Sequence, residues 1–270
     1  MINAARSSFM VLVSAGMVTL LMTTTVAAQV PLPGRIVDLT HAFDTETIYW
    51  PTEKGFQFER GNNGRTPKGY YYAANRFTTA EHGGTHLDAP VHFSEGRQTA
   101  EQVPLERLMG AAVVIDVSAA CAKDIDYQIT VADLNAWEVR NKRQLVDVIV
   151  LLKTGWSKFW TDRVRYLGTN RLGSEAIAEL RFPGLAPEAA RWLVEQRSIK
   201  AIGIDTASID YGRSTHFESH VLLCGHNVPI FENVADLAAL PVLGATVIAL
   251  PMKIAGGSGG PLRIVALVSE

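Results

Sequence analysis

Cysteine and excess charge are both scarce in this sequence. Two cysteines occur in 270 residues, and the formal net charge at pH 7 is −2. Two cysteines cannot supply the disulfide framework of a small secreted domain. A weakly negative chain without a basic run lacks the charge pattern of a nucleic-acid-binding protein. Cys121 and Cys224 stand far apart in the chain, and we expect two free, mostly buried thiols.

Long apolar runs are also missing, and the nearest approach to one lies at the N-terminus. Arg6 precedes an apolar, small-residue stretch over 9–22, and further small residues lead to Ala28. The stretch is short for a membrane span, which takes about 20 apolar residues. Its basic start, apolar core and small residues are typical of a secretory signal peptide. We predict a signal peptide over 1–28 and a mature domain over 29–270, periplasmic in a Gram-negative host; a retained anchor is the alternative.

Repeats and low-complexity segments are absent as well. A glycine-rich stretch over 253–263 lacks the Gly-Lys-Ser/Thr ending of a phosphate-binding P-loop. The composition is 47% apolar and 19% charged, which is ordinary for a globular protein. The length suits one large domain or two small ones.

Short apolar runs alternate with a few segments of helical character. We expect strands over 35–40, 70–77, 111–117, 146–152, 199–204 and 245–250, and helices over 131–140 and from Pro187. Turn composition predicts a loop over 61–69, and the polar stretch over 157–183 predicts a surface segment. This order indicates an α/β domain. Asp205 follows a predicted buried strand, where α/β folds place function, although a turn residue is an equal alternative.

The densest group of candidate site residues spans 81–93. It contains His82, His86, Asp88 and His92, all at even positions. Two glycines disfavour a helix there, at about 1 kcal/mol each. In an extended chain the four side chains would share one face, with Gly84 leaving space between them. Imidazole and carboxylate are preferred ligands of zinc and related divalent metals. The cluster predicts a metal site rather than ordinary loop histidines.

A second group lies over 216–232, with three more histidines and a glutamate. Six of the seven histidines therefore fall into two short windows. Because neither window alone completes a metal site and its supporting partners, we expect the two to converge in space. We expect His216 and His226 to be surface or supporting residues.

The first group resembles the motif His-x-Gly-Thr-His-x-Asp-x-Pro-x-His of the metal-dependent cyclase-like hydrolases, which include bacterial kynurenine formamidases and isatin hydrolases. The resemblance covers most of residues 35–268. It implies a single α/β domain of the swivelling β/β/α type with a mixed sheet, a similar C-terminal glycine-rich loop, and a dimer or tetramer. It also implies that His82, His86 and Asp88 bind metal, that His220 and Glu232 serve a second metal position, and that His92 is the acid/base.

The metal-site residues predict hydrolysis, and the resemblance implies that the substrate is a small aromatic amide. A bound divalent ion, Zn²⁺ or Mn²⁺ in one or two positions, lowers the pKa of water to about 7 and polarises a carbonyl. Histidine suits proton transfer near neutral pH. An aryl formamide such as N-formylkynurenine and a cyclic amide such as isatin are the substrate candidates. Two rival classes are a metal-dependent lyase or cyclase and a non-catalytic periplasmic metal-binding protein.

Aromatic residues near the first histidine group are candidates for a substrate wall. Trp50, Tyr71 and Phe77 are the specific candidates, and for Trp50 a packing role at the rim is an equal alternative. We expect no nucleic-acid partner and no membrane association after signal cleavage.

Overall fold

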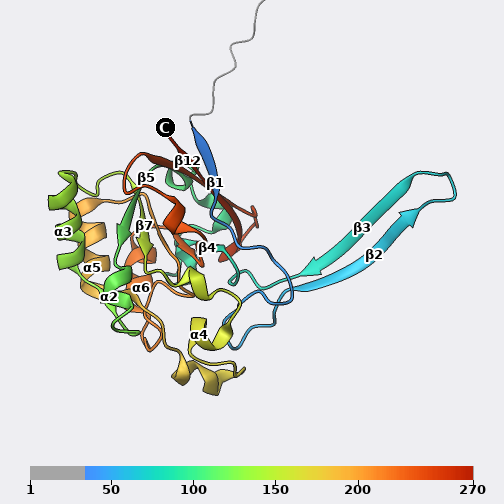
Figure 1. The fold of residues 1–270 in the computed structure, drawn as a ribbon, viewed down its shortest axis with the longest axis horizontal. Coiled ribbons are helices and arrows are strands. Elements are labelled where there is room, and N and C mark those ends of the chain that lie inside the picture. The colour runs from blue at the N-terminus through green and yellow to red at the C-terminus, as the bar shows by residue number, and fades with distance from the viewer. Residues whose placement is uncertain (1–33, 270) are drawn as a thin grey trace, which may run out of the picture. The chain divides into compact units, whose positions relative to one another are not determined.

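A mixed β-sheet that closes on itself forms the centre of the fold (Figure 1). The structure is a computed structural model, and it describes residues 34–269. The strand order is β1-β12-β11-β5-β7-β9-β10-β4, and β12 also pairs with β4, so that seven strands close into a barrel. The strands are β1 (Arg35–Asp38), β2 (Gln57–Arg65), β3 (Tyr71–Thr78), β4 (His86–Asp88), β5 (Met109–Asp116), β6 (Gln128–Ile129), β7 (Ile149–Lys153), β8 (Gly184–Leu185), β9 (Ala201–Ile204), β10 (Ile230–Glu232), β11 (Ala245–Pro251) and β12 (Gly259–Val268).

Helical segments connect the parallel part of this sheet. Strands β5, β7, β9 and β10 run parallel, and the other neighbours in the barrel are antiparallel. Parallel neighbours need crossover connections. The α-helices are α1 (Leu105–Leu108), α2 (Ser118–Cys121), α3 (Val131–Asn141), α4 (Arg163–Leu167), α5 (Pro187–Trp192) and α6 (Glu218–Gly225). Short 3-10 or π segments are η1 (Pro90–His92), η2 (Ala100–Gln102), η3 (Ser157–Phe159), η4 (Ser174–Glu179), η5 (Leu193–Arg197) and η6 (Leu237–Ala239).

Three buried clusters make up the hydrophobic core. One fills the barrel, with Leu87, Leu151 and Ile264 among its members. A second lies between the sheet and helices α3, α5 and α6, which Figure 1 shows on one side of the sheet. A third cluster packs Ile48 against buried side chains from the segment 156–182. The segment over 157–183 is therefore wrongly predicted as a surface excursion, because Tyr166, Leu180 and Phe182 are fully buried.

Most predicted elements are confirmed with small shifts at their ends. Helix α3 begins after Thr130, whose hydroxyl accepts from the Asp133 backbone while the Asp133 carboxylate accepts from the Thr130 backbone. This reciprocal cap satisfies two free backbone donors. Both cysteines are free and buried, as expected. The signal peptide predicted for 1–28 lies outside the described residues, and no helix within 34–269 is long and apolar enough to cross a membrane.

Strands β2 and β3 form a separate hairpin that extends away from the barrel (Figure 1). The loop predicted over 61–69 is wrong for its first part, because β2 continues to Arg65 and pairs with β3. The hairpin is exposed on both faces. Its large apolar side chains are between 47% and 61% exposed, namely Phe58, Tyr70, Tyr71, Tyr72 and Phe77.

His41 is the histidine that lies outside the two sequence windows, and it packs against Trp160. Its ring stacks on Trp160 at 4.1 Å between ring centroids, and its Nε2 is buried without a hydrogen-bond partner among residues 34–269. Burial lowers the pKa of His41 to about 4, from 6.5. Between these two pH values the unfolded chain therefore binds more protons than the folded chain.

We expect this difference to weaken the metal-free protein as the pH falls from about 6.5 toward 4. His41→Phe keeps the stacking on Trp160 and removes the titration. The free energy of unfolding of wild type, measured with urea at pH 7 and pH 4.5, should fall by about 1–3 kcal/mol more than that of the variant. Equal losses in the two proteins would show that His41 does not titrate as described.

Candidate active site

Strand β4 carries the centre of the predicted metal motif and lies between β10 and β12. Its residues His86 and Asp88 stand two positions apart and so point to the same face. Register places Glu232 of β10 directly opposite His86, and Gly259 of β12 opposite Asp88. Directly opposed side chains share a face. The barrel therefore brings the glutamate of the second sequence window onto the aspartate and histidine of the first.

The turn that precedes β4 depends on its two glycines. Gly83 and Gly84 have φ values of +151° and +59°. The Gly84 carbonyl accepts from His86 Nδ1 at 2.9 Å and from Asn233 Nδ2 at 2.7 Å. The predicted extended chain is correct only over β4. His82 lies in the turn and His92 ends the 3-10 segment η1, so chain reversal rather than strand alternation brings them to the site.

Gly83→Ala should destabilise the protein strongly. A Cβ at position 83 would lie 2.0 Å from the Tyr49 ring, and the backbone there is in a region that disfavours side chains. Strain and overpacking together should cost about 3 kcal/mol. Gly96→Ala is the matched control, since Gly96 has φ +73° but nothing within 4 Å of the added carbon. Thermal unfolding should show a clearly lower melting temperature for Gly83→Ala than for the control, and similar values would contradict the packing argument.

Helix α6 supplies His220, which completes the buried part of the site. His220 Nε2 lies 3.3 Å from Asp88 Oδ2 and 3.2 Å from Glu232 Oε1. His220 Nδ1 donates to Asp210 Oδ2 at 2.6 Å, and Asp210 also accepts from the backbone nitrogens of 219 and 220. The expected convergence of the two histidine windows is confirmed as geometry.

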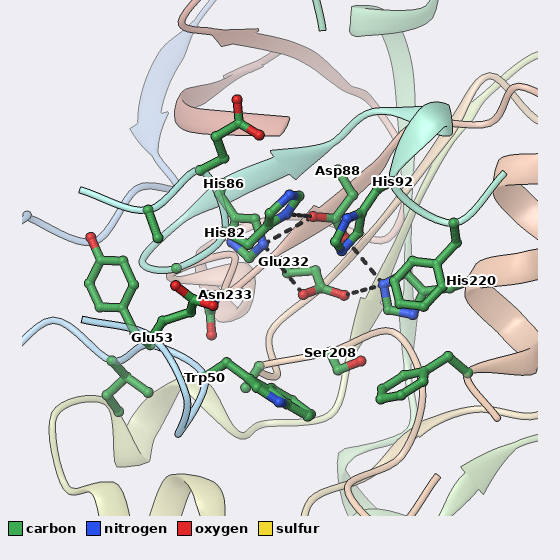
Figure 2. A pocket seen from close by; sticks show the side chains of 18 residues that line it. Trp50, Glu53, His82, His86, Asp88, His92, Ser208, His220, Glu232 and Asn233 are labelled. Carbon is green, nitrogen blue, oxygen red and sulfur yellow. Dashed lines mark hydrogen bonds and ion pairs between the residues drawn. The ribbon is translucent and has the colours of Figure 1, made fainter. Parts of the chain in front are cut away.

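The donor atoms of these side chains meet around Asp88, as Figure 2 shows. Asp88 Oδ1 lies 2.6 Å from His82 Nδ1 and 3.1 Å from His86 Nε2. His86, Asp88 and Glu232 form one group whose ligand atoms lie within 4.8 Å of one another, and His82, Asp88 and His92 form another. His86, Asp88, His220 and Glu232 are each less than 5% exposed.

His92 differs from the other three histidines of the site, each of which has a hydrogen-bond partner on the ring nitrogen that faces away from Asp88. His86 donates from Nδ1 to the Gly84 carbonyl, His220 donates to Asp210, and His82 Nε2 lies 2.9 Å from Ser258 Oγ. Such partners orient metal-binding imidazoles. Among residues 34–269, neither ring nitrogen of His92 has a hydrogen-bond partner; its ring stacks on His82 at 3.7 Å. This arrangement suits three fixed ligands and one histidine free to exchange a proton.

The electrostatics of the site favour a cation. Burial opposes charge at His86, yet the nearby Asp88 and Glu232 carboxylates raise its pKa to about 9. Despite burial, the charge of His86 and the histidine hydrogen bonds hold the pKa of Asp88 well below its usual range. Burial lowers the pKa of His92 to about 3, so that this ring is neutral at pH 7. Two carboxylates thus draw positive charge toward the buried imidazoles.

The donor set fits a divalent metal. Imidazole nitrogens and carboxylate oxygens converge, and two buried carboxylates would balance the charge of one dication. His82, His86, Asp88, His220 and Glu232 are the residues that would hold it. Their roles, and that of His92 as acid/base, stay predictions, since only their positions are shown.

A cavity of about 340 Å³ opens beside these residues. Trp50, for which a substrate wall and a packing role at the rim were equal alternatives, lines the cavity and lies 6.2 Å from Phe217 between ring centroids. Figure 2 shows Trp50 on the other side of the Glu232 carboxylate from the His82 and His86 rings. Phe93 and Phe217 also line the cavity and were missed, although each stands in or beside a histidine window.

The prediction that Tyr71 and Phe77 line the substrate site is wrong for this chain alone. Both lie on the exposed hairpin and neither lines the cavity. Their proximity to the motif in sequence does not bring them to the cavity, because β3 carries these side chains away from β4.

The remaining candidates have structural or surface positions. Asp205 accepts from the backbone nitrogens of Thr154, Gly155 and Trp156, so it fixes the end of β7, which is the turn role. His216 and His226 are exposed and lie outside the cavity lining.

The closed mixed barrel thus carries a histidine–carboxylate cluster of metal-ligand residue types beside an aromatic cavity. The chain belongs to the cyclase family: the family model described as "Putative cyclase" matches residues 37–211. Isatin hydrolase of Roseibium aggregatum is 31% identical over 210 residues, covering 75% of this chain and 77% of that protein. Kynurenine formamidase of Erythrobacter litoralis is 29% identical over 231 residues, covering 86% of this chain and 93% of that protein.

Solved structures agree with the predicted fold. The structure of isatin hydrolase A from Ralstonia solanacearum matches with a TM-score of 0.78 and 32% identity, over 87% of this chain and 92% of that one. Other matching structures carry the description of metal-dependent hydrolase. The expectation of a single α/β domain with a mixed sheet is confirmed.

Proposed function

We propose that the protein hydrolyses the carbon–nitrogen bond of a small aromatic amide with a divalent metal, Zn²⁺ or Mn²⁺. The observation that carries the proposal is the meeting of the buried His86–Asp88–Glu232 group with an aromatic-walled cavity. The names of the curated relatives, isatin hydrolase and kynurenine formamidase, support it.

The residues divide the reaction between them. A divalent ion held by the histidine–carboxylate cluster would supply Lewis acidity and would lower the pKa of an attacking water to about 7. His92 is neutral and lines the cavity, so it accepts a proton from that water and returns it to the leaving nitrogen. The carbonyl carbon gains the hydroxyl and the nitrogen gains the hydrogen, which balances hydrolysis. The side chains of Trp50, Phe93 and Phe217 would pack against the aromatic ring of the substrate and exclude water from the cavity.

The charge of the cavity favours isatin over N-formylkynurenine. Its lining contains the carboxylates of Glu53 and Glu81 but no lysine or arginine. The amino-acid tail of N-formylkynurenine carries an ammonium group, which Glu53 or Glu81 could pair with, and a carboxylate, which would meet no lysine or arginine among the described residues that line the cavity. Isatin is neutral and needs no such partner. Isatin also lacks the flexible tail, which suits a cavity near the lower end of the usual 300–1,000 Å³ range for ligand sites.

The test measures metal content and turnover together. Protein purified without added metal is assayed for zinc and manganese, and for hydrolysis of isatin and N-formylkynurenine before and after chelation. Bound metal with chelator-sensitive isatin hydrolysis supports the proposal. Bound metal without hydrolytic product would favour the lyase or metal-binding alternatives, and absence of metal binding would overturn the proposal.

We also propose that the chain is exported and works outside the cytoplasm. The basic start, apolar core and small residues of 1–28 support this. Cell fractionation with N-terminal sequencing tests it, and a mature chain that begins at Gln29 is the expected result.

We propose further that the protein is a homo-oligomer joined through the β2–β3 hairpin. A two-stranded hairpin is marginal in water by itself, and exposed aromatic patches mark interaction surfaces. The hairpin presents five exposed aromatic side chains. The aromatic contacts of these side chains are with neighbours in or beside the hairpin, such as that between Phe56 and Phe77 at 5.7 Å between ring centroids.

Excising the hairpin should therefore give a monomer. Gln57 and Thr78 are cross-strand partners, so a two-glycine turn can join them in place of 58–77. Light scattering should show a dimer or larger assembly for wild type and a single chain for the variant, with metal content unchanged. A monomeric wild type would contradict the proposal.

A further inference from the structure

The glycine-rich loop between β11 and β12 contacts the metal motif rather than an open surface. Its backbone is fixed to the motif, since Ala89 N donates to the Ser258 carbonyl at 2.8 Å and Gly259 pairs with Asp88. A Cβ at Gly259 would lie 2.6 Å from His82 Cε1. Position 259, where the loop enters β12, thus needs glycine because it packs closely against Leu87 and His82.

We infer that Ser258 and Glu81 form a hydrogen-bonded chain that positions His82 to bind metal. This inference rests on the proposed metal site. Ser258 Oγ lies 2.9 Å from His82 Nε2 and 2.5 Å from Glu81 Oε2, and the Ser258 backbone nitrogen donates to the same carboxylate oxygen at 3.0 Å.

The chemistry of these groups fixes the direction of the chain. A carboxylate only accepts, so the single hydroxyl hydrogen of Ser258 points to Glu81. The hydroxyl oxygen is then left to accept, and His82 must carry its hydrogen on Nε2. The lone pair of neutral His82 is consequently on Nδ1, the nitrogen that faces Asp88 Oδ1 at 2.6 Å. Two lone pairs cannot face each other at this distance, so a hydrogen joins the two atoms when no metal is bound, and a bound cation would take its place.

The two buried histidines, His86 and His220, are oriented by hydrogen bonds in the same way. His86 is held by a carbonyl and His220 by the Asp210 carboxylate, each through the nitrogen that faces away from Asp88. His82 is the most exposed of the three, with a side chain 23% exposed, against 4% for His86 and His220. Packing restrains His82 least, so its orientation depends most on hydrogen bonds. Ser258 and Glu81 are positioning residues in this scheme, since they act through His82.

The experiment compares Zn²⁺ dissociation constants, measured by competition with a chromophoric chelator, and melting temperatures of the metal-free proteins. Ser258→Ala should weaken Zn²⁺ binding about 10-fold to 100-fold, while Ser258→Thr should restore it through the retained hydroxyl. Glu81→Ala should weaken binding as well, and the double variant Glu81→Ala/Ser258→Ala should bind no worse than Ser258→Ala, because both residues act in one chain.

Glu101→Gln is the matched control. The Glu101 carboxylate accepts from Gly256 N at 3.1 Å and so anchors the same loop, but the contacts of its carboxylate do not include a histidine. It should bind Zn²⁺ as wild type does. Wild-type affinity in Ser258→Ala, or equal weakening in Glu101→Gln, would overturn the inference while the metal site itself stands. Loss of affinity in Ser258→Ala without any loss in Glu81→Ala would also overturn it. Failure of wild type to bind either Zn²⁺ or Mn²⁺ would instead overturn the proposed function.

Discussion

Asp88→Asn is expected to abolish tight metal binding and turnover together. Asp88 is 1% exposed, and its two oxygens face His82, His86 and His220. An asparagine keeps the size but turns one oxygen into an NH₂ group, which donates where the site needs an acceptor. It also removes one of the two buried negative charges that would balance a dication.

The expected loss in Zn²⁺ affinity exceeds about 100-fold, since even outer partners of metal ligands are worth 10-fold to 100-fold. Hydrolysis of isatin should fall with it. Asp116→Asn is the control, because Asp116 is exposed and pairs with Lys153 outside the cavity. Circular dichroism verifies that both variants fold. Full metal content at wild-type affinity in Asp88→Asn would mean that Asp88 is not a ligand.

His92→Ala should leave the metal in place and remove the reaction. His92 is neutral and lines the cavity, and within residues 34–269 it has no hydrogen bond of the kind that orients the other three histidines of the site. Loss of a general acid/base typically costs about 10²-fold to 10⁴-fold in rate. We expect a fall of that size in kcat for isatin, with a Zn²⁺ dissociation constant close to that of wild type.

This variant separates the enzyme from a metal-sequestering protein. The ligand atoms of His82, Asp88 and His92 lie within 4.8 Å of one another. A sequestering protein would therefore use His92 as a ligand and lose metal affinity in His92→Ala. His226→Ala is the control, because His226 is exposed and its Nδ1 donates to the Leu222 carbonyl on the surface. Weakened metal binding in His92→Ala together with unchanged kcat would contradict the assignment.

The local part of the site could be predicted from the sequence. His82, His86, Asp88 and His92 are of the residue types that bind metal, and the glycines between them mark a turn. Their closeness in sequence predicted their convergence, but turns rather than the predicted strand alternation bring His82 and His92 to the site. The two histidine windows were expected to converge because each alone was incomplete, and the family resemblance singled out His220 and Glu232. Register between β4 and β10 supplies the physical reason for Glu232.

The supporting residues could not be predicted in this way. Ser258 reaches His82 only because β12 pairs with β4, and hydrophobic periodicity does not indicate which strands become neighbours. Phe217 lines the cavity because α6 begins there, whereas Tyr71 and Phe77 leave on a hairpin despite standing closer to the motif in sequence. Closure of the barrel is likewise a long-range pairing that strand-by-strand patterns do not contain.

The pairing of β12 with β4 also sets the order of events during synthesis. Asp88 emerges from the ribosome long before Gly259, its partner in the barrel. Contacts between such distant segments form late and slow the folding of a chain. Until β12 docks, the motif strand has an unpaired edge, and the loop that contacts His82 is not in place. Metal binding at the proposed site is therefore expected to follow the pairing of β12 with β4.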